Sequence, residues 1–239
     1  MSERLRTRLA AALAKRGIDG TAAVIEPTEP EPALVAAQER IPFVYRQALP
    51  EHPQVKAWVR AVADAAVPPH TGGLHPHYGA RGRRQIGHGP SLLLWGGTGT
   101  GKTHTAYGAI RALTAAGCGV RWQATTVADL FAELRPRPGT DPEFLLRRTV
   151  RVPLLLLDDL GAARGTAWTE EILFRLVNWR CQHRLPTLFT TNLPPVRSAD
   201  VPASQPVLRD AVGDRVLSRL SGMCTPIRLT GPDRRFQRH

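Results

Sequence analysis

The sequence has few cysteines, no long hydrophobic run and fewer acidic than basic residues. The three cysteines, Cys118, Cys181 and Cys224, are far apart and form no CxxC pair, so neither a zinc ribbon nor a disulfide framework is indicated. No apolar run approaches the roughly 20 residues that a membrane-spanning helix needs. The first residues also lack the continuous apolar segment of a secretory signal. These absences predict a soluble protein of the cytoplasm.

The shortage of acidic residues leaves a strong positive charge. Lysine and arginine number 32 against 20 aspartates and glutamates, which gives a formal net charge of +12. This charge favours contact with nucleic acid, because each phosphate that is neutralised releases condensed counterions. The alternative is a general excess of arginine, since arginine is scattered along the whole chain. Charge alone leaves both interpretations open.

Residues 1–32 are expected to form a segment apart from a main domain over 33–239. Leu5, Leu9 and Leu13 recur at helical spacing among basic residues, which predicts a short amphipathic helix. Such a narrow apolar stripe either contacts a partner or folds back on its own domain. The proline-rich stretch 26–32 then predicts a linker.

The main domain is expected to begin with a helix over 55–66, followed by a loop rich in glycine, proline and histidine. The loop histidines, His70, His75, His77 and His88, could in principle bind a metal. No cysteine or carboxylate cluster joins them, and the glycine and proline content argues against a rigid site. A surface loop is therefore the favoured interpretation.

From about residue 90 to 230, short apolar runs alternate with helical segments. Strands are expected at 91–95, 118–122, 154–158, 187–191 and 224–229. Helices are expected near 102–116, 126–134, 168–184 and 207–221. Strands that are buried on both faces read as continuous apolar runs, so this alternation predicts an α/β fold with a parallel sheet flanked by helices.

The segment GGTGTGKT at 96–103 satisfies the pattern GxxxxGK[ST] and lies between a predicted strand and a predicted helix. Its glycines allow successive backbone amides to turn inward around phosphate oxygens at a helix N-terminus. Lys102 would bridge the β- and γ-phosphates, and the hydroxyl of Thr103 would bind Mg²⁺. The pattern predicts an ATP site formed by Gly96, Gly97, Thr98, Gly99, Thr100, Gly101, Lys102, Thr103 and His104.

Two aspartates come at the end of the apolar strand expected at 154–158. Asp158 is predicted to hold Mg²⁺ through water, which makes Thr103 and Asp158 the metal-binding residues. Asp159 occupies the position where ATPases of this class usually carry the glutamate that polarises the attacking water. Aspartate is one methylene shorter, and a displacement of about 1 Å can cost on the order of a hundredfold in rate. Slow hydrolysis is therefore predicted.

Two later features narrow the kind of P-loop protein. Asn192 follows the strand expected at 187–191, where a polar side chain can reach the γ-phosphate and the attacking water. Arg215 and Arg219 lie one helical turn apart and project from one face. An arginine delivered across a subunit interface can be worth roughly 10³ to 10⁵ in rate. The alternative for these arginines is a solvated helix face.

The order of these motifs resembles the DnaC/IstB group of AAA+ ATPases, which are bacterial replicative helicase loaders and helpers of transposition. The resemblance covers about Ser91 to Arg235, through LLLWGGTGTGKTHTAYGAI, LLLLDDLG, TLFTTNLP and GDRVLSRLSGMCTPIRLTGPDRR. It implies a P-loop NTPase fold with an AAA+ core and no C-terminal lid domain. It also implies a sensor 1 role for Asn192 and an arginine finger at Arg219, with Arg215 close by.

Several functions follow from this resemblance. The leading interpretation is a slow ATPase that self-associates through its ATP site, assembles on DNA, expected to be single-stranded, and acts on a replicative helicase. A second interpretation keeps the fold and replaces the helicase with a transposase. A third is a nucleotide-dependent binding switch with little hydrolysis, which Asp159 keeps open. A small-molecule kinase is disfavoured, because the paired aspartates and the strand before Asn192 are features of ATPases.

Overall fold

The computed structural model describes residues 32–67, 84–118, 121–162, 165–197 and 201–233. The chain divides into two units, Met1–Glu31 and Pro32–His239, and every described residue belongs to the second. The predicted amphipathic helix and most of the predicted linker therefore lie outside the described residues. The same holds for His70, His75 and His77 of the histidine-rich loop.

The centre of the second unit is a five-stranded sheet in which all neighbouring strands are parallel, in the order β2-β3-β4-β1-β5. The strands are β1 (Ser91–Trp95), β2 (Trp122–Thr126), β3 (Leu154–Asp158), β4 (Thr187–Thr191) and β5 (Cys224–Arg228). The predicted parallel sheet is thus confirmed. Because β4 lies between β1 and β3, the residues that follow these three strands gather along one edge of the sheet.

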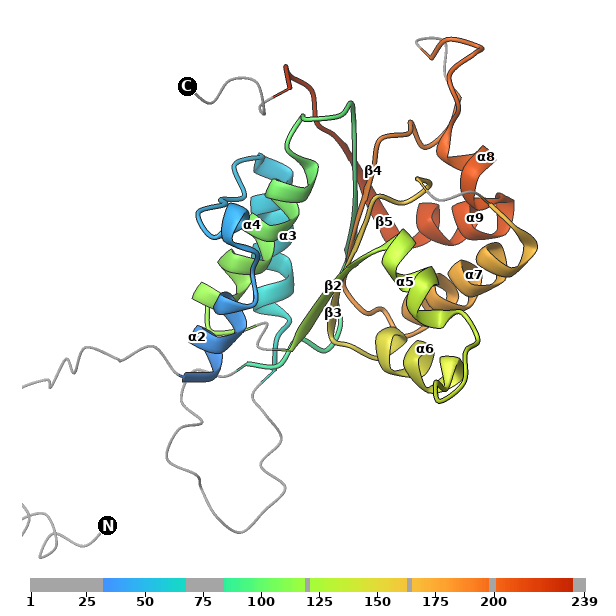
Figure 1. Ribbon diagram of the computed structural model, residues 1–239. Coiled ribbons are helices and arrows are strands. Elements are labelled where there is room, and N and C mark those ends of the chain that lie inside the picture. Colours follow the sequence, from blue (N-terminus) through green and yellow to red (C-terminus); the bar gives the residue numbers. More distant parts are fainter. Residues whose placement is uncertain (1–31, 68–83, 119–120, 163–164, 198–200, 234–239) are drawn as a thin grey trace, which may run out of the picture. The chain divides into compact units, whose positions relative to one another are not determined.

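Helices cover both faces of the sheet (Figure 1). One face carries α2 (Pro32–Glu39), the 3₁₀ helix η1 (Phe43–Tyr45), α3 (Pro53–Asp64) and α4 (Lys102–Ala115). The other carries α5 (Val127–Leu134), α6 (Pro142–Val150), α7 (Ala167–Gln182), α8 (Leu208–Val212) and α9 (Asp214–Met223). Side chains alternate along each strand, so Leu92 and Leu94 pack under α3 and α4 whereas Leu93 packs under the second group.

Two of the expected elements are wrong in detail. The strand expected at 118–122 lies instead at Trp122–Thr126. β2 is an edge strand with only one buried residue, so it lacks the continuous apolar run from which the strands were predicted. The helix expected at 207–221 is two helices, α8 and α9. Gly213 separates them with φ 80° and ψ 161°, and a Cβ at this position would overlap Glu170.

Two helices were not expected at all, α2 and α6. For α6 the sequence does carry a signal, since the Asp141 side chain accepts a hydrogen bond from the backbone N–H of Phe144 at 3.1 Å and Pro142 occupies the first helical turn. None of the described helices combines the length and apolar character that crossing a bilayer requires.

Candidate nucleotide-binding site

The glycine-rich loop joins the end of β1 to the start of α4. Gly99 and Gly101 have φ values of 76° and 91°, a left-handed backbone that glycine adopts at little cost. Gly101 is also the N-cap of α4, and it offers no side chain to the first amides of the helix. The first amides of an α-helix have no partner within the helix itself, and beside a glycine-rich loop such amides are suited to bind an anion.

Lys102, the first residue of α4, lies inside the curve of this loop. Its side chain is 6% exposed, and Nζ donates hydrogen bonds to the carbonyl oxygens of Gly96 at 3.1 Å and Gly97 at 2.7 Å. The carbonyl of Gly97 also accepts the hydroxyl of Thr100 at 2.9 Å. The loop thus holds a positive charge among backbone dipoles, which is an arrangement suited to phosphate.

Thr103 at the start of α4 is hydrogen-bonded to Asp158 at the end of β3. The Thr103 hydroxyl donates to both carboxylate oxygens, 3.0 Å from Oδ1 and 3.2 Å from Oδ2. A hydroxyl and a carboxylate beside a phosphate loop are the oxygen ligands that Mg²⁺ takes when phosphates and waters complete its coordination. The residues present therefore fit a magnesium–nucleotide complex. In the part of the chain that the structure describes, no group of three or more His, Cys, Asp or Glu side chains is arranged to hold a metal ion.

The surroundings of Asp158 shift its proton affinity. Burial raises the pKa of its carboxyl group, the hydrogen bond from Thr190 opposes that rise, and the neighbouring charge of Asp159 adds to it. Burial, with a smaller contribution from Asp158, raises the pKa of Tyr107 to about 12. Tyr107 therefore stays neutral at the edge of the site.

Asp159 follows β3 with an unusual backbone. Its φ is 57°, and its N–H donates to the hydroxyl of Thr190 at 3.0 Å. Aspartate tolerates this left-handed region better than most residues, because its short polar side chain costs little there. Asn192 lies just beyond the end of β4, on the same edge of the sheet, and its side chain is exposed. Asp158, Asp159 and Asn192 thus belong to adjacent strand ends.

The two predicted arginines lie on α9, and their surroundings differ. The guanidinium of Arg215 lies 3.8 Å from the ring centroid of Phe174 and 3.7 Å from Glu171 Oε2, both on α7. Arg219 is exposed one turn further along. Among the described residues, no hydrogen bond or ion pair joins either arginine to the phosphate loop. Within one chain, therefore, the described contacts of Arg215 are to α7 and not to the phosphate loop.

Sequence reasoning missed two groups of residues near the site. Thr190 bonds to both aspartates, and the only signal for it is that β4 ends in consecutive threonines at the edge where Asp158 lies. The second group is aromatic: Tyr45 of η1 stacks on Tyr107 with ring centroids 4.7 Å apart and approaches His104 edge-on at 6.4 Å. The predicted residue His104 thus packs beside an aromatic pair next to the loop.

The fold and the loop together define the class of this protein. A parallel sheet with a phosphate loop after the interior strand β1, and an acidic pair at the end of β3, is the P-loop NTPase fold with an AAA+ core. No lid domain occurs among the described residues that follow β5. Residues 84–236, more than half of the chain, match the family model of the IstB-like ATP binding protein, and the chain belongs to this family.

Relatives and solved structures agree with this assignment. The replicative helicase loader DnaI of Bacillus subtilis is 26% identical over 156 residues, and DnaC of Escherichia coli is 27% identical over 133 residues. These matches cover 63% and 54% of this chain, and the chain spans about half, 49%, of each relative. A crystal structure of the DnaC helicase loader shares the fold, with a TM-score of 0.57 and 23% identity over 79% of this chain and 99% of the other. A crystal structure of DnaI has a TM-score of 0.52 and 21% identity over 87% of this chain and 94% of the other.

Proposed function

We propose that this protein is an AAA+ ATPase that acts in DNA replication like a helicase loader, and that slow ATP hydrolysis is coupled to its assembly on DNA with a replicative helicase. The observation that carries the ATPase is the contact of Thr103 with Asp158 beside the buried Lys102. The helicase partner is supported by the similarity to DnaI and DnaC, whose names describe them as replicative helicase loaders.

The chemistry that we assign to the site uses groups already close together. Lys102 exchanges its bonds to the loop carbonyls for the β- and γ-phosphates, while the amides at the start of α4 bind the phosphate oxygens. Thr103, and Asp158 through water, would hold Mg²⁺, which would supply positive charge that neutralises the phosphates. Asp159 orients the attacking water and Asn192 contacts the γ-phosphate.

The arginines suggest that hydrolysis requires assembly. Arg219 is exposed and has no contact with the phosphate loop of its own chain, so we assign it to the site of a neighbouring copy. Such an arginine stabilises the charge on the transferred phosphoryl group only after the chains associate. Turnover is then low for the isolated chain and rises in the assembly.

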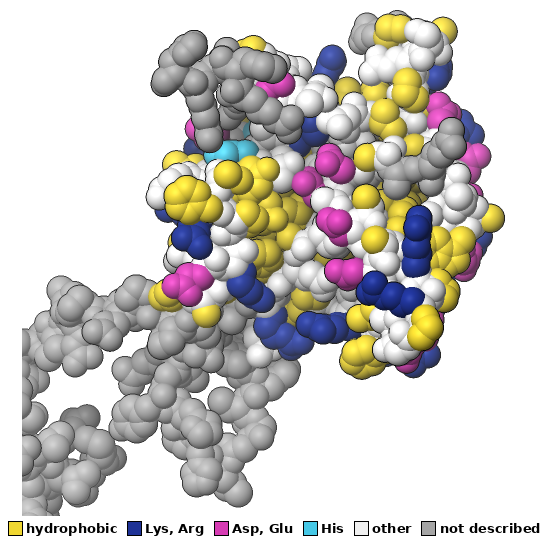
Figure 2. Space-filling view, in the orientation of Figure 1, with side chains coloured by type: hydrophobic (Ala, Val, Ile, Leu, Met, Phe, Trp, Pro, Cys, Tyr) yellow, Lys and Arg dark blue, Asp and Glu magenta, His cyan; other side chains and the backbone are white. Residues whose placement is uncertain are grey.

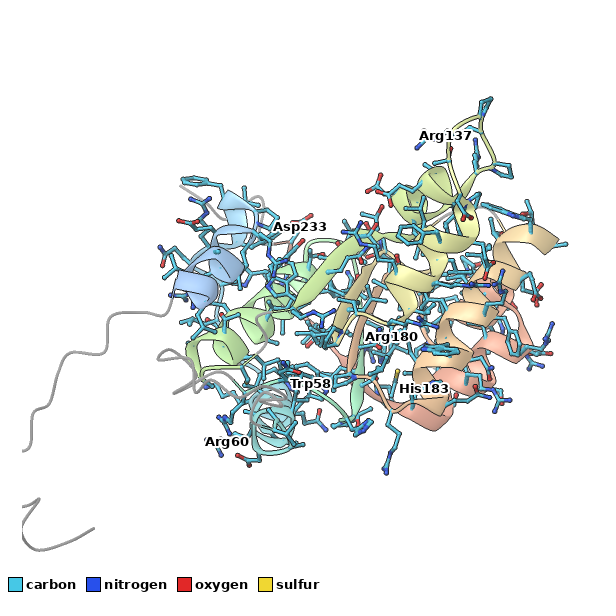
Figure 3. All side chains as sticks on the ribbon, turned by 90° about the horizontal axis from the view of Figure 1, so that it is seen from below. Trp58, Arg60, Arg137, Arg180, His183 and Asp233 are labelled. Carbon is cyan, nitrogen blue, oxygen red and sulfur yellow. The ribbon has the colours of Figure 1, made fainter. Side chains whose placement is uncertain are left out.

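A cleft on the α5 side of the molecule supports contact with single-stranded DNA. It has a volume of about 520 Å³ and lies between α5 and the start of α7. Its walls include Phe131 and Trp168, whose ring centroids are 5.8 Å apart, and Arg135. Arg137 lies on the projecting loop that follows α5 (Figure 3), and the face drawn in Figure 2 exposes basic side chains together with acidic ones. An aromatic platform with flanking arginines suits a stacked base and its phosphate.

The DNA contact can be tested with two aromatic variants. Trp168→Ala removes an indole that is 37% exposed in the cleft, and Phe144→Ala removes a ring that is 61% exposed on α6 outside it. Stacking is worth about 1–3 kcal/mol per base, so Trp168→Ala should weaken binding of a fluorescent oligodeoxythymidine roughly 5- to 150-fold. Equal losses of affinity for the oligonucleotide in the two variants would rule out the cleft as the DNA-binding site.

The ATPase is tested by Lys102→Ala. Without the ammonium group, binding of a fluorescent ATP analogue or its turnover should be lost, while the thermal unfolding of the nucleotide-free chain changes little. Turnover of the wild-type chain should be measured with and without single-stranded DNA and with a bacterial replicative helicase. A chain that binds ATP and shows no turnover in any mixture would instead be a nucleotide-dependent binding switch, which Asp159 in place of glutamate also allows.

A second function is supported by the family match, because the IstB-like family model covers residues 84–236. In this alternative the same site acts on a transposase. Both candidate functions use the same ATPase site, so the partner has to be tested directly. Binding of the full chain to a replicative helicase and to a transposase, each measured with ATP and with ADP, distinguishes the two, because the true partner should respond to the nucleotide.

A further inference from the structure

Thr190, the fourth residue of β4, connects the two acidic residues of the candidate site. Its side chain is fully buried. The hydroxyl donates to Asp158 Oδ1 at 2.5 Å and accepts the backbone N–H of Asp159 at 3.0 Å. A hydroxyl group is one donor and two acceptors, so both bonds form at once. One buried side chain therefore links the carboxylate of Asp158 to the backbone of Asp159.

The register of the sheet explains this position. Leu157 of β3 pairs with Phe189 of β4, so Asp158 and Thr190 come next on neighbouring strands. Alternation along β4 turns Thr190 to the same face as Leu188, which packs under α3 and α4. Thr103 belongs to α4 and approaches Asp158 from that face. The Asp158 carboxylate is thus held from the helix by Thr103 and from the sheet by Thr190.

The backbone at Asp159 needs such support. Its φ of 57° lies in the left-handed region, which costs roughly 1–2 kcal/mol for most residues with a side chain and less for aspartate. Conformations of this kind persist when the surrounding structure fixes them. Three hydrogen bonds to β4 fix this conformation. The first is the bond from the Asp159 N–H to the Thr190 hydroxyl. In addition, the Leu160 N–H donates to the Thr190 carbonyl at 2.8 Å, and the Thr191 hydroxyl donates to the Leu160 carbonyl at 2.6 Å.

We propose that Thr190 is a positioning residue of the ATPase site, whose hydroxyl orients the Asp158 carboxylate for magnesium and fixes the backbone from which Asp159 reaches the attacking water. The inference rests on the proposed function, in which these two aspartates have those tasks. We assign Thr190 no contact of its own with nucleotide or metal, because its hydroxyl is bonded to Asp158 and Asp159. Its removal should therefore weaken the response to magnesium and slow turnover, while binding of the nucleotide without magnesium, which depends on the phosphate loop, is retained.

The test uses the full chain and three variants. Thr190→Val removes the hydroxyl and keeps the shape, whereas Thr190→Ser keeps the hydroxyl and removes the methyl. Thr114→Val is the matched control: Thr114 is 1% exposed on α4, and its hydroxyl donates to the Arg111 carbonyl at 2.8 Å and accepts a bond from Gln38 at 3.1 Å. Affinity for a fluorescent ATP analogue is measured in excess EDTA and then across a magnesium titration, together with kcat.

We expect Thr190→Val to bind the analogue in EDTA within about twofold of the wild type. Its half-saturating magnesium concentration should rise about 10-fold or more, because residues that orient metal ligands are worth on the order of 10- to 100-fold in metal affinity or activity. Its kcat should fall by a similar factor. Thr190→Ser should restore most of both values, and Thr114→Val should resemble the wild type throughout.

Two results would overturn the positioning role. One is a magnesium response and a kcat in Thr190→Val that match the wild type. The other is a Thr190→Ser variant as defective as Thr190→Val, because packing of the methyl group would then explain the loss. Failure of the wild-type chain itself to bind nucleotide would instead overturn the proposed function, and this inference with it. If Thr190→Val does not fold, Thr190→Ala also lacks the hydroxyl and is compared with Thr190→Ser in its place.

Discussion

The Nε atom of Arg180 donates a 2.7 Å hydrogen bond to the hydroxyl oxygen of Thr187 in the interior of the domain. Arg180 belongs to α7 and is fully buried between this helix and the sheet (Figure 3). Its remaining guanidinium nitrogens donate to the carbonyl oxygens of Val150, Val152 and Pro186 at 2.8–3.0 Å. Burial lowers the pKa of Arg180 to about 9, which still leaves it protonated at neutral pH.

This arrangement predicts that Arg180→Lys destabilises the protein, although it preserves the charge. A lysine ammonium group cannot reproduce the planar arrangement of guanidinium donors, so at least two buried carbonyls lose their hydrogen-bond donor. Each loss costs about 1–3 kcal/mol of stability. The loss in free energy of unfolding should be about 2–5 kcal/mol by urea denaturation. Arg148→Lys, at an exposed position on α6, is the matched control and should change stability by less than about 0.5 kcal/mol. Similar small effects for both variants would contradict a structural role for the buried arginine.

A second prediction concerns Asp159 and separates binding from turnover. Asp159→Asn removes the charge and keeps the tolerance of the left-handed backbone, because asparagine also populates that region. Affinity for magnesium-ATP should remain within about threefold of the wild type, while turnover should fall by on the order of 10²-fold or more, the range of general-base contributions. Turnover is measured by the release of phosphate in a stopped assay, and affinity is measured by titration with an ATP analogue. Unchanged turnover would mean that another group orients the water.

Sequence reasoning predicted the local motifs of the site and missed the contacts between them. The phosphate loop is read directly, since eight consecutive residues carry it between a strand and a helix. The role of Thr190 could not be predicted, because it depends on β4 lying between β1 and β3. No single segment of the sequence determines the order of the strands. Arg180 was also missed, since an arginine in a helix is expected at the surface. The edge strand β2 was misplaced because four of its five residues are only half-buried, so it lacks a continuous apolar run.

The two arginines of α9 are predicted to behave differently when replaced. Arg215 contacts Phe174 and Glu171 within the chain, so Arg215→Ala should lower the stability of the isolated chain by about 0.5–1 kcal/mol, the usual range for an exposed cation–π contact. Arg219→Ala should leave stability and ATP affinity unchanged. In the assembled state it should reduce turnover by roughly 10³-fold or more if it acts as the finger. Full turnover of Arg219→Ala at high protein concentration would exclude action across subunits.

The last prediction concerns the segment after β5, where Asp233 lies against the phosphate loop. A Cβ at Gly96 would overlap the backbone carbonyl of Leu229, and a Cβ at Gly99 would overlap the side-chain carboxyl group of Asp233, so this segment lies directly against the loop. A carboxylate beside the phosphate-binding amides repels the phosphates. A repulsion of about 1 kcal/mol corresponds to roughly a fivefold change in affinity.

Asp233→Asn should therefore tighten binding of a fluorescent ATP analogue roughly fivefold at low salt, and less at high salt because the charges are screened. Asp64→Asn removes the same charge from the exposed end of α3 and is the matched control, for which no change is expected. Equal affinities for the two variants would show that the carboxylate of Asp233 does not act on the nucleotide. Weaker binding by Asp233→Asn would instead mean that this side chain supports the loop, since removing a repulsive charge cannot weaken the attraction of the loop for phosphate.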